Sequence, residues 1–313
     1  MADCSAAFAS FHQAISLTKT EKRFLRSARS AITKKLIAFF ASRERCPKIE
    51  FKVQGSFSMG TIVRPLDGDF DIDIGIYLLN YGNWQHNWPK PEAVSQWLVT
   101  ALSGHTSLQP VNKRNCVRIH YKPRAGTKNF IGYHVDLPIY IEYESFFGKY
   151  TRIGITGEKQ WNHKSDPIGF TKWFFEESQK NKGDVNQLTR LVKYIKAWKD
   201  YSSNGTKFPS GMALTILMAK QYQPHKRDDV AFALTIKEAW AILYGFFGLE
   251  TITSPVVPHN NLLSRLTRNQ KDNFQAALTR LKDLSGKAVN TENAIEAMEC
   301  WQQCFGSRMP FTT

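Results

Sequence analysis

Apolar and polar residues recur with two different periods along the chain, and the change of period divides it. Up to residue 165, four segments alternate apolar and polar side chains, as strands with one buried face do. These predicted strands lie at 49–53, 70–78, 116–121 and 133–143. Helical periodicity takes over after residue 165. The predicted helices there lie at about 167–181, 184–201, 210–223, 235–247, 264–284 and 291–304.

Two further helices are predicted among the strands. Thr18 and Glu21 fit a capping box, and apolar residues then recur at helical spacing from Lys19 to Arg43. A second helix begins at Pro91 and ends near Leu102. The pattern therefore predicts an α+β fold: residues 1–165 with a long N-terminal helix and a mixed sheet, then a mainly helical domain at 166–313.

The composition is that of a packed protein. Of the 313 residues, 42% are hydrophobic and 13% aromatic, which suits a core and not a disordered chain. No apolar run approaches the roughly 20 residues that a membrane-spanning helix needs. The first residues lack the pattern of a secretory signal, and an odd number of scattered cysteines argues against a disulfide framework. We expect a cytoplasmic protein without a membrane partner.

The net charge of +15 narrows the range of partners. Such an excess attracts polyanions, namely nucleic acid, nucleoside triphosphates or an anionic membrane surface. It does not distinguish among them. Since the sequence has no run of five basic residues, we expect the charge to be spread over folded surfaces.

Three aspartates fall at every second position where the predicted strand at 70–78 begins; the first of them directly precedes the strand. They are Asp69, Asp71 and Asp73. Alternate side chains of a strand share one face, so Asp71 and Asp73 point the same way. Neighbouring carboxylates repel one another unless a cation lies among them, and paired carboxylates are ligands that Mg²⁺ accepts. A solvated acidic strand is the other interpretation, and this segment alone favours neither.

A glycine and a serine lie about fifteen residues before the acidic segment. Gly55 and Ser56 directly follow a predicted strand. A glycine allows the backbone to approach a ligand closely, and exposed N–H groups with a serine hydroxyl bind phosphate oxygens. An isolated Gly-Ser is an ordinary turn; its position before Asp-x-Asp makes the phosphate interpretation more specific.

A third carboxylate interrupts the apolar strand at 133–143. Asp136 lies between Val135 and Leu137, directly after His134. If this strand pairs with the strand of Asp71 and Asp73, three carboxylates come together. Such a set can hold two metal ions about 3.5–4 Å apart, the arrangement used for in-line phosphoryl displacement.

These motifs resemble a known family. Gly55-Ser56, Asp71-Ile-Asp73 and Asp136 are similar to the polymerase-β-like nucleotidyltransferases. The longer string QGSF…T…RP…DIDIGIYL resembles the bacterial cGAS/DncV-like nucleotidyltransferases (CD-NTases), the oligonucleotide cyclases of anti-phage CBASS systems. LVKYIKAWK at 191–199 and PSGMALT at 209–215 resemble the helical part of that family. The similarity covers about residues 50 to 225.

The resemblance implies roles for individual residues and a fold. The fold would be a polymerase-β-like nucleotidyltransferase core whose nucleotide-binding cleft is completed by the helical domain. The metal-binding and catalytic triad would be Asp71, Asp73 and Asp136. The nucleotide-binding residues would be Gln54, Gly55, Ser56, Lys196 and Ser210. Lys193 is the alternative to Lys196 as the lysine that binds the triphosphate. The lysines are three positions apart, so both can lie on one helix face. Without the aspartates, the lysines would be a solvated stripe.

Three features stand apart from this assignment. The His/Cys zinc insertion of the animal DNA sensor is not matched, so activation by nucleic acid is not implied. Asp69 extends the acidic row and receives no role. Arg118 and His120 alternate on one strand; Arg118 is a candidate for nucleotide binding because guanidinium groups pair with phosphates and stack on bases. A solvated sheet face explains them equally well.

The family implies a Mg²⁺-dependent enzyme, with Mn²⁺ as a substitute, that makes a cyclic di- or trinucleotide from ATP, GTP or other nucleoside triphosphates. A product like cGAMP is expected, together with a downstream effector that senses it and a monomeric enzyme. One alternative uses the same triad to extend RNA 3′ ends. A second is a binding module that has kept the fold without activity, which three intact carboxylates argue against.

Overall fold

The computed structural model describes residues 1–43, 47–67, 69–122, 132–146, 148–180, 183–246, 248, 251–257 and 261–311. Contacts divide the chain into two compact units. The sheet unit comprises residues 17–60 and 67–171, and the helical unit comprises residues 1–16, 61–66 and 172–313. We predicted one boundary at residues 165 and 166. The contacts place the main boundary at 171 and 172 and assign two earlier segments to the helical unit.

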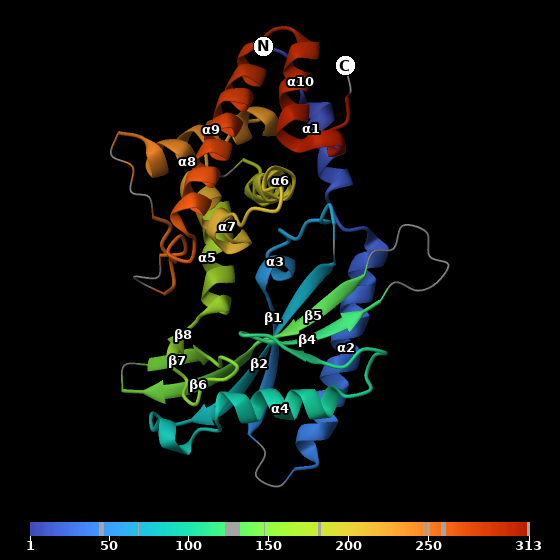
Figure 1. Cartoon of the computed structure of the whole chain (residues 1–313), viewed down its shortest axis with the longest axis vertical. Coiled ribbons are helices and arrows are strands. Elements are labelled where there is room, and N and C mark those ends of the chain that lie inside the picture. Colours follow the sequence, from blue (N-terminus) through green and yellow to red (C-terminus); the bar gives the residue numbers. More distant parts are fainter. Residues whose placement is uncertain are drawn as a thin grey trace. The chain divides into compact units, whose positions relative to one another are not determined.

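The strands of the sheet unit form a single mixed sheet with the order β3-β4-β5-β2-β6-β7-β8, and β1 also pairs with β2 (Figure 1). Their bounds are β1 Lys48–Gln54, β2 Phe70–Tyr81, β3 Val111–Asn112, β4 Val117–Tyr121, β5 Tyr133–Leu137, β6 Ile139–Ser145, β7 Gly148–Ile153 and β8 His163–Lys164. β2 is antiparallel to β1 and parallel to both β5 and β6. The mixed sheet and the α+β class are as predicted.

Strand β2 owes its position to its apolar face. Phe70, Ile72 and Ile74 are buried, whereas Asp71 and Asp73 between them are partly exposed. Burying the three apolar side chains favours this orientation of the strand by several kcal/mol, at roughly 1.5–3 kcal/mol for each side chain. The carboxylates are thereby held on the opposite face of the sheet.

The long strand predicted at 133–143 is two strands, β5 and β6, separated at Pro138. Proline has no N–H to donate to a sheet, and this interrupts the pairing. The carbonyl of Pro138 still accepts a hydrogen bond of 2.9 Å from the N–H of Ile76. Both halves therefore stay parallel to β2, and β5 pairs with the part of β2 that carries the aspartates.

Two long helices pack in the sheet unit. They are α2 Lys19–Ala41 and α4 Pro91–Leu102, which contact each other as well as strands of the sheet (Figure 1). Thr18 and Glu21 form the predicted capping box of α2. Leu25, Ile32 and Leu36 are fully buried, so the predicted amphipathic face is the one that packs. A short helix, α3 Gly55–Ser58, follows β1 directly, and η1 Gln85–Asn87 precedes α4.

The helical unit is built from α-helices that include an N-terminal one. Their bounds are α1 Ser5–Ala14, α6 Gln187–Ser202, α7 Gly211–Lys220, α8 Asp228–Tyr244, α9 Arg268–Asn290 and α10 Ala294–Phe305, followed by η2 Gly306–Arg308. The boundary between the two units lies within α5 Pro167–Gln179. No helix among the described residues is long and apolar enough to cross a membrane.

An aromatic cluster explains why the N-terminus belongs to the helical unit. Phe8 and Phe11 of α1 are almost completely buried. The ring of Phe8 packs edge-on against Tyr194 of α6 and Trp301 of α10, with centroid distances of 5.2 and 4.8 Å. Such pairs stabilise beyond the area that they bury. The contacts join residues almost 300 positions apart.

Helix α1 and strands β3, β7 and β8 were not predicted, and α8 begins seven residues before its predicted start. The predicted ends at residues 181 and 247 lie outside the described residues. The remaining predicted helices and strands are present, with ends that differ by a few residues. The missed strands are short or exposed, and their alternation is correspondingly weak.

Candidate functional site

Polar side chains form two rows across three neighbouring strands of the sheet unit. In the first row, Asp71 of β2 is in register with His134 of β5, which is opposite His120 of β4. In the second row, Asp73 is in register with Asp136, which is opposite Arg118. Adjacent strands lie about 4.8 Å apart, so residues in register on one face are close neighbours. The structure thus brings the three predicted aspartates together.

Arg118 is bound to the third carboxylate. Its Nε and Nη2 donate hydrogen bonds of 2.7 and 2.8 Å to the two oxygens of Asp136. The hydrogen bonds that Arg118 donates to Asp136 raise the pKa of Arg118. We had predicted Arg118 as a nucleotide-binding residue; the described contact is with Asp136 instead. A nucleotide contact by its other donors stays a prediction.

The carboxylates suit a hard divalent cation. Asp71 and Asp136 each offer an oxygen within 4.8 Å of the other, and Asp73 is in register with Asp136. Each carboxylate oxygen has two lone pairs. The two hydrogen bonds from Arg118 occupy one lone pair on each oxygen of Asp136, so the other lone pair of each oxygen can bind a cation. Oxygen donors of this kind fit Mg²⁺ or Mn²⁺. The residues present therefore fit the predicted cation.

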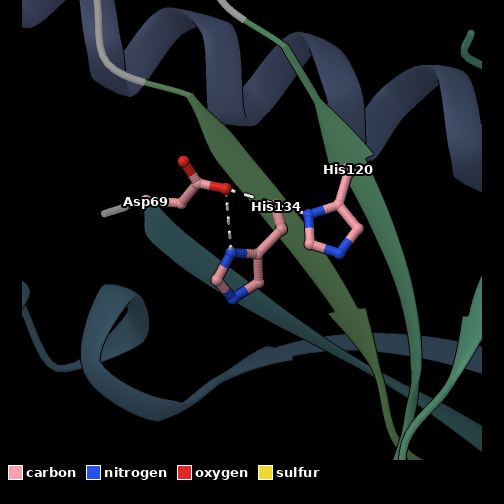
Figure 2. A group of neighbouring side chains, drawn as sticks. All are labelled: Asp69, His120 and His134. Atoms are coloured by element: carbon pink, nitrogen blue, oxygen red, sulfur yellow. Dashed lines mark ion pairs between the residues drawn. The ribbon is translucent and has the colours of Figure 1, made fainter. Parts of the chain in front are cut away.

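His134 lies among the carboxylates. Its Nε2 is 4.0 Å from Asp71 Oδ2 and 3.9 Å from Asp136 Oδ2. Burial lowers the pKa of His134, although Asp136 opposes this effect. On the other side of the ring, Nδ1 faces Asp69 (Figure 2). The sequence motif included His134, but we had assigned it no role.

Gly55 is required next to Asp73. Its φ of +68° lies in the left-handed region, and a Cβ at this position would collide with Asp73 Oδ2. Gly55 therefore lies beside the carboxylate of Asp73, and Ser56 follows it in the first turn of α3. This arrangement suits the predicted role of both residues as phosphate contacts, which stays a prediction.

The side chain of Gln54 is held within the sheet unit, and its predicted phosphate contact stays a prediction. Its side chain is buried, its Nε2 donates a 2.7 Å hydrogen bond to Tyr140 Oη, and its Oε1 accepts one of 3.1 Å from Tyr77 Oη. Gly75 leaves the space for this amide, since a Cβ there would collide with Oε1. The side chain thus supports the end of β1 from within the sheet unit.

In the helical unit, Lys196 lies beside the start of α7. Its Nζ donates hydrogen bonds to the carbonyl and the hydroxyl of Thr61, at 3.2 and 3.0 Å. A Cβ on Gly211 would lie 3.4 Å from Lys196 Cε. The residue before that glycine, Ser210, is exposed and caps α7 by accepting a hydrogen bond from the N–H of Ala213. The predicted pair, Lys196 and Ser210, is therefore adjacent in space.

Lys193 points elsewhere within the same unit. Its Nζ donates a 3.1 Å hydrogen bond to Ser16 Oγ and lies 3.3 Å from His12 Nε2. Lys193 and Lys196 are both more than nine-tenths buried, which differs from a solvated stripe. Lys196 lies beside Gly211, the residue after Ser210, whereas the described contacts of Lys193 are with His12 and Ser16. Which of the two lysines binds the triphosphate stays a prediction.

Comparison with known proteins identifies the part of the chain that carries the carboxylates. Residues 49–140 match the family model for the nucleotidyltransferase domain of cyclic GMP-AMP synthase DncV-like proteins. Residues 49–140 are thus similar to a DncV-like nucleotidyltransferase domain. This match includes Gly55, Ser56 and all three predicted metal ligands, and it bears out the resemblance that the motifs indicated.

Curated relatives are cyclic-nucleotide synthases. A cyclic GMP-AMP synthase of Escherichia albertii is 29% identical over 191 residues, which cover 60% of this chain and 40% of that protein. A cyclic AMP-AMP-AMP synthase of an Acinetobacter strain is 26% identical over 269 residues, covering 82% of this chain and 72% of that protein. The chain thus spans well under half of the first of these relatives.

The fold is also shown by solved structures. The apo form of Vibrio cholerae DncV matches with a TM-score of 0.77 at 16% identity, covering 98% of this chain and 96% of that one. The same protein bound to the linear intermediate 5′ pppA(3′,5′)pG matches with a TM-score of 0.72 at 18% identity, over 97% of each chain. The similarity extends through the helical unit, of which the family match includes only residues 61–66.

A test of the nucleotidyltransferase assignment separates the two lysines. Replacing Lys196 with Met removes a charge-assisted contact of about 1.5–3 kcal/mol, so we expect KM for the nucleoside triphosphate to rise about 10- to 100-fold. Lys193→Met should raise KM less. Lys220→Met, at an exposed lysine of α7, is the control. Steady-state kinetics with thermal denaturation of each variant checks this; a larger KM increase for Lys193→Met contradicts the assignment.

Proposed function

We propose that this chain is a Mg²⁺-dependent nucleotidyltransferase that joins nucleoside triphosphates into a cyclic di- or trinucleotide. The observation that carries the proposal is the position of Asp71, Asp73 and Asp136 on one face of the sheet, beside Gly55, within the residues that are similar to a DncV-like nucleotidyltransferase domain. Curated relatives named as synthases of cyclic GMP-AMP and cyclic AMP-AMP-AMP support a cyclic product.

Each residue has a separate task in this proposal. Asp71, Asp73 and Asp136 bind the cation. Arg118 holds Asp136 in place through two hydrogen bonds and keeps its carboxylate oriented toward the other two. Gly55 lets the backbone and Ser56 approach a phosphate, and Lys196 with Ser210 binds the triphosphate. Bound Mg²⁺ would activate a ribose hydroxyl and neutralise the departing pyrophosphate.

The substrates and the biological role are part of the same proposal. ATP and GTP are the expected substrates, because relatives are named for products that contain AMP and GMP. DncV structures with ATP and GTP support triphosphates as donor and acceptor. We further propose that the product is like cGAMP and that a downstream effector senses it in anti-phage defence. The enzyme is proposed to be monomeric and cytoplasmic.

An experiment with two substrates tests it against the RNA alternative. The protein is incubated with Mg²⁺ and radiolabelled ATP and GTP, once alone and once with a short RNA primer, and the products are separated after phosphatase treatment. We expect a phosphatase-resistant product from the triphosphates alone. We expect the RNA primer to keep its original length. A primer that lengthens while no resistant product forms would replace the cyclase by a terminal nucleotidyltransferase.

A further inference from the structure

A second group of potential metal ligands lies beside the catalytic carboxylates. It consists of Asp69, His120 and His134, which come from the segment before β2, from β4 and from β5 (Figure 2). Asp69 Oδ2 is 3.8 Å from His120 Nδ1 and 3.9 Å from His134 Nδ1. One atom of each residue lies within 4.8 Å of the other two. The family resemblance assigns no role to Asp69, and the proposed reaction does not use it.

The distances in this group indicate a space between the three atoms and not a set of direct hydrogen bonds. Hydrogen bonds between nitrogen and oxygen are 2.7–3.2 Å long. A metal ion bound at about 2.0–2.2 Å to each ligand holds neighbouring ligand atoms about 3–3.5 Å apart in octahedral or tetrahedral geometry. Side-chain movements of less than about 1 Å would close the group around such an ion.

A buried nitrogen without a partner points into the same space. His134 is more than nine-tenths buried, and among the described residues its Nδ1 has no hydrogen-bond partner. Leaving a buried polar atom unsatisfied costs about 1–3 kcal/mol, so an uncompensated site of this kind is unusual. A metal ion would satisfy Nδ1.

The surrounding backbone makes room for Asp69. Gly132 precedes β5, and a Cβ there would lie 2.5 Å from Asp69 Oδ1. A larger residue would collide with this carboxylate and force it to shift. Oδ1 therefore packs over a glycine, while Oδ2 faces both rings (Figure 2).

The geometry points to a binding site for a divalent transition-metal ion, such as Zn²⁺ or Co²⁺, formed by Asp69, His120 and His134 and separate from the magnesium carboxylates. Two imidazoles and one carboxylate favour this class of ion, whereas Mg²⁺ prefers oxygen ligands. Three protein ligands leave coordination positions for water. The inference does not depend on the proposed cyclase activity.

The same histidine connects the new site to the catalytic carboxylates. With a metal on Nδ1, the proton of His134 is on Nε2, which faces Asp71 and Asp136 at 4.0 and 3.9 Å. Metal-bound histidines usually donate their second N–H to a carboxylate, which fixes the ring and its tautomer. The transition metal would thus orient His134 toward the carboxylates that bind magnesium.

Titration of the full chain tests the site. Metal-free protein is titrated with Co²⁺ under excess Mg²⁺, which fills the oxygen site, and binding is followed by visible absorption and by calorimetry. We expect one equivalent of Co²⁺ to bind. His120→Ala and Asp69→Asn should each weaken binding more than about tenfold, since the loss of even an outer-shell partner costs about 10- to 100-fold. His86→Ala, at an exposed histidine, should leave the affinity unchanged.

Two results would overturn the inference. In the first, the wild type binds no Co²⁺ in the presence of Mg²⁺. In the second, Co²⁺ binds, but Asp73→Asn removes the binding while His120→Ala and Asp69→Asn do not, which would place the ion among the catalytic carboxylates. Asp69 and His120 are partly exposed, so their replacement leaves the core of the sheet unit intact. Neither result bears on whether the chain makes a cyclic nucleotide.

Discussion

Replacing Asp73 with Asn is expected to reduce the rate of pyrophosphate release by about 10³-fold or more. Asp73 is in register with Asp136 on β5, and its carboxylate lies beside Gly55. Asn keeps the shape but removes the negative charge that holds the cation. A loss of about 4 kcal/mol of metal-dependent stabilisation in the transition state corresponds to about 10³-fold in rate.

The matched control is Asp67→Asn, six residues earlier at an exposed position of the same unit. Initial rates of pyrophosphate release at saturating Mg²⁺ should be unchanged for this variant. Circular dichroism of both variants verifies that the fold is kept. If Asp73→Asn retains more than a tenth of the wild-type rate, Asp73 is not a ligand on which catalysis depends.

Replacing Phe8 with Ala is expected to destabilise the helical unit by about 3–5 kcal/mol, the cost of deleting a large buried aromatic side chain. The ring is 1% exposed and packs against Tyr194 and Trp301. A cavity would remain between helices that are far apart in sequence. Urea denaturation followed by circular dichroism measures the loss, and hydrogen exchange in α6 and α10 localises it.

Phe311→Ala provides the comparison, because Phe311 is 46% exposed in the same unit. Exposed substitutions usually change stability by no more than about 0.5 kcal/mol. Equal urea midpoints for Phe8→Ala and Phe311→Ala would mean that α1 is not part of the helical core. That outcome would also contradict the assignment of residues 1–16 to the helical unit.

Local patterns predicted most elements because their causes are local. The capping box at Thr18, the alternation in β2 and the proline at the start of α4 each act within a few residues. Helix α1 was missed because it is short and most of its apolar residues are alanines, and the burial of Phe8 depends on α6 and α10. The strand predicted at 133–143 is interrupted at Pro138 because proline has no N–H to donate. The alternation of apolar and polar residues continues across Pro138 and so does not reveal this interruption.

Prediction of the candidate site from local patterns is limited in the same way. The sequence places Asp71 and Asp73 on one face, but the register of β5 against β2, which brings in Asp136, comes from tertiary pairing. Arg118 and His120 alternate in the sequence, yet only the pairing of β4 with β5 shows that one meets Asp136 and the other His134. The hydrogen bonds of Gln54 could not be predicted, because its partners, Tyr77 and Tyr140, lie on two other strands.

Mass spectrometry of the reaction products tests the central claim most directly. The full chain is incubated with ATP, GTP and Mg²⁺, treated with phosphatase, and compared with the Asp73→Asn variant. The account predicts an ion with the mass of a cyclic di- or trinucleotide, without terminal phosphates, for the wild type and not for the variant. The absence of any such ion from the wild type, or its equal abundance in both samples, would contradict it.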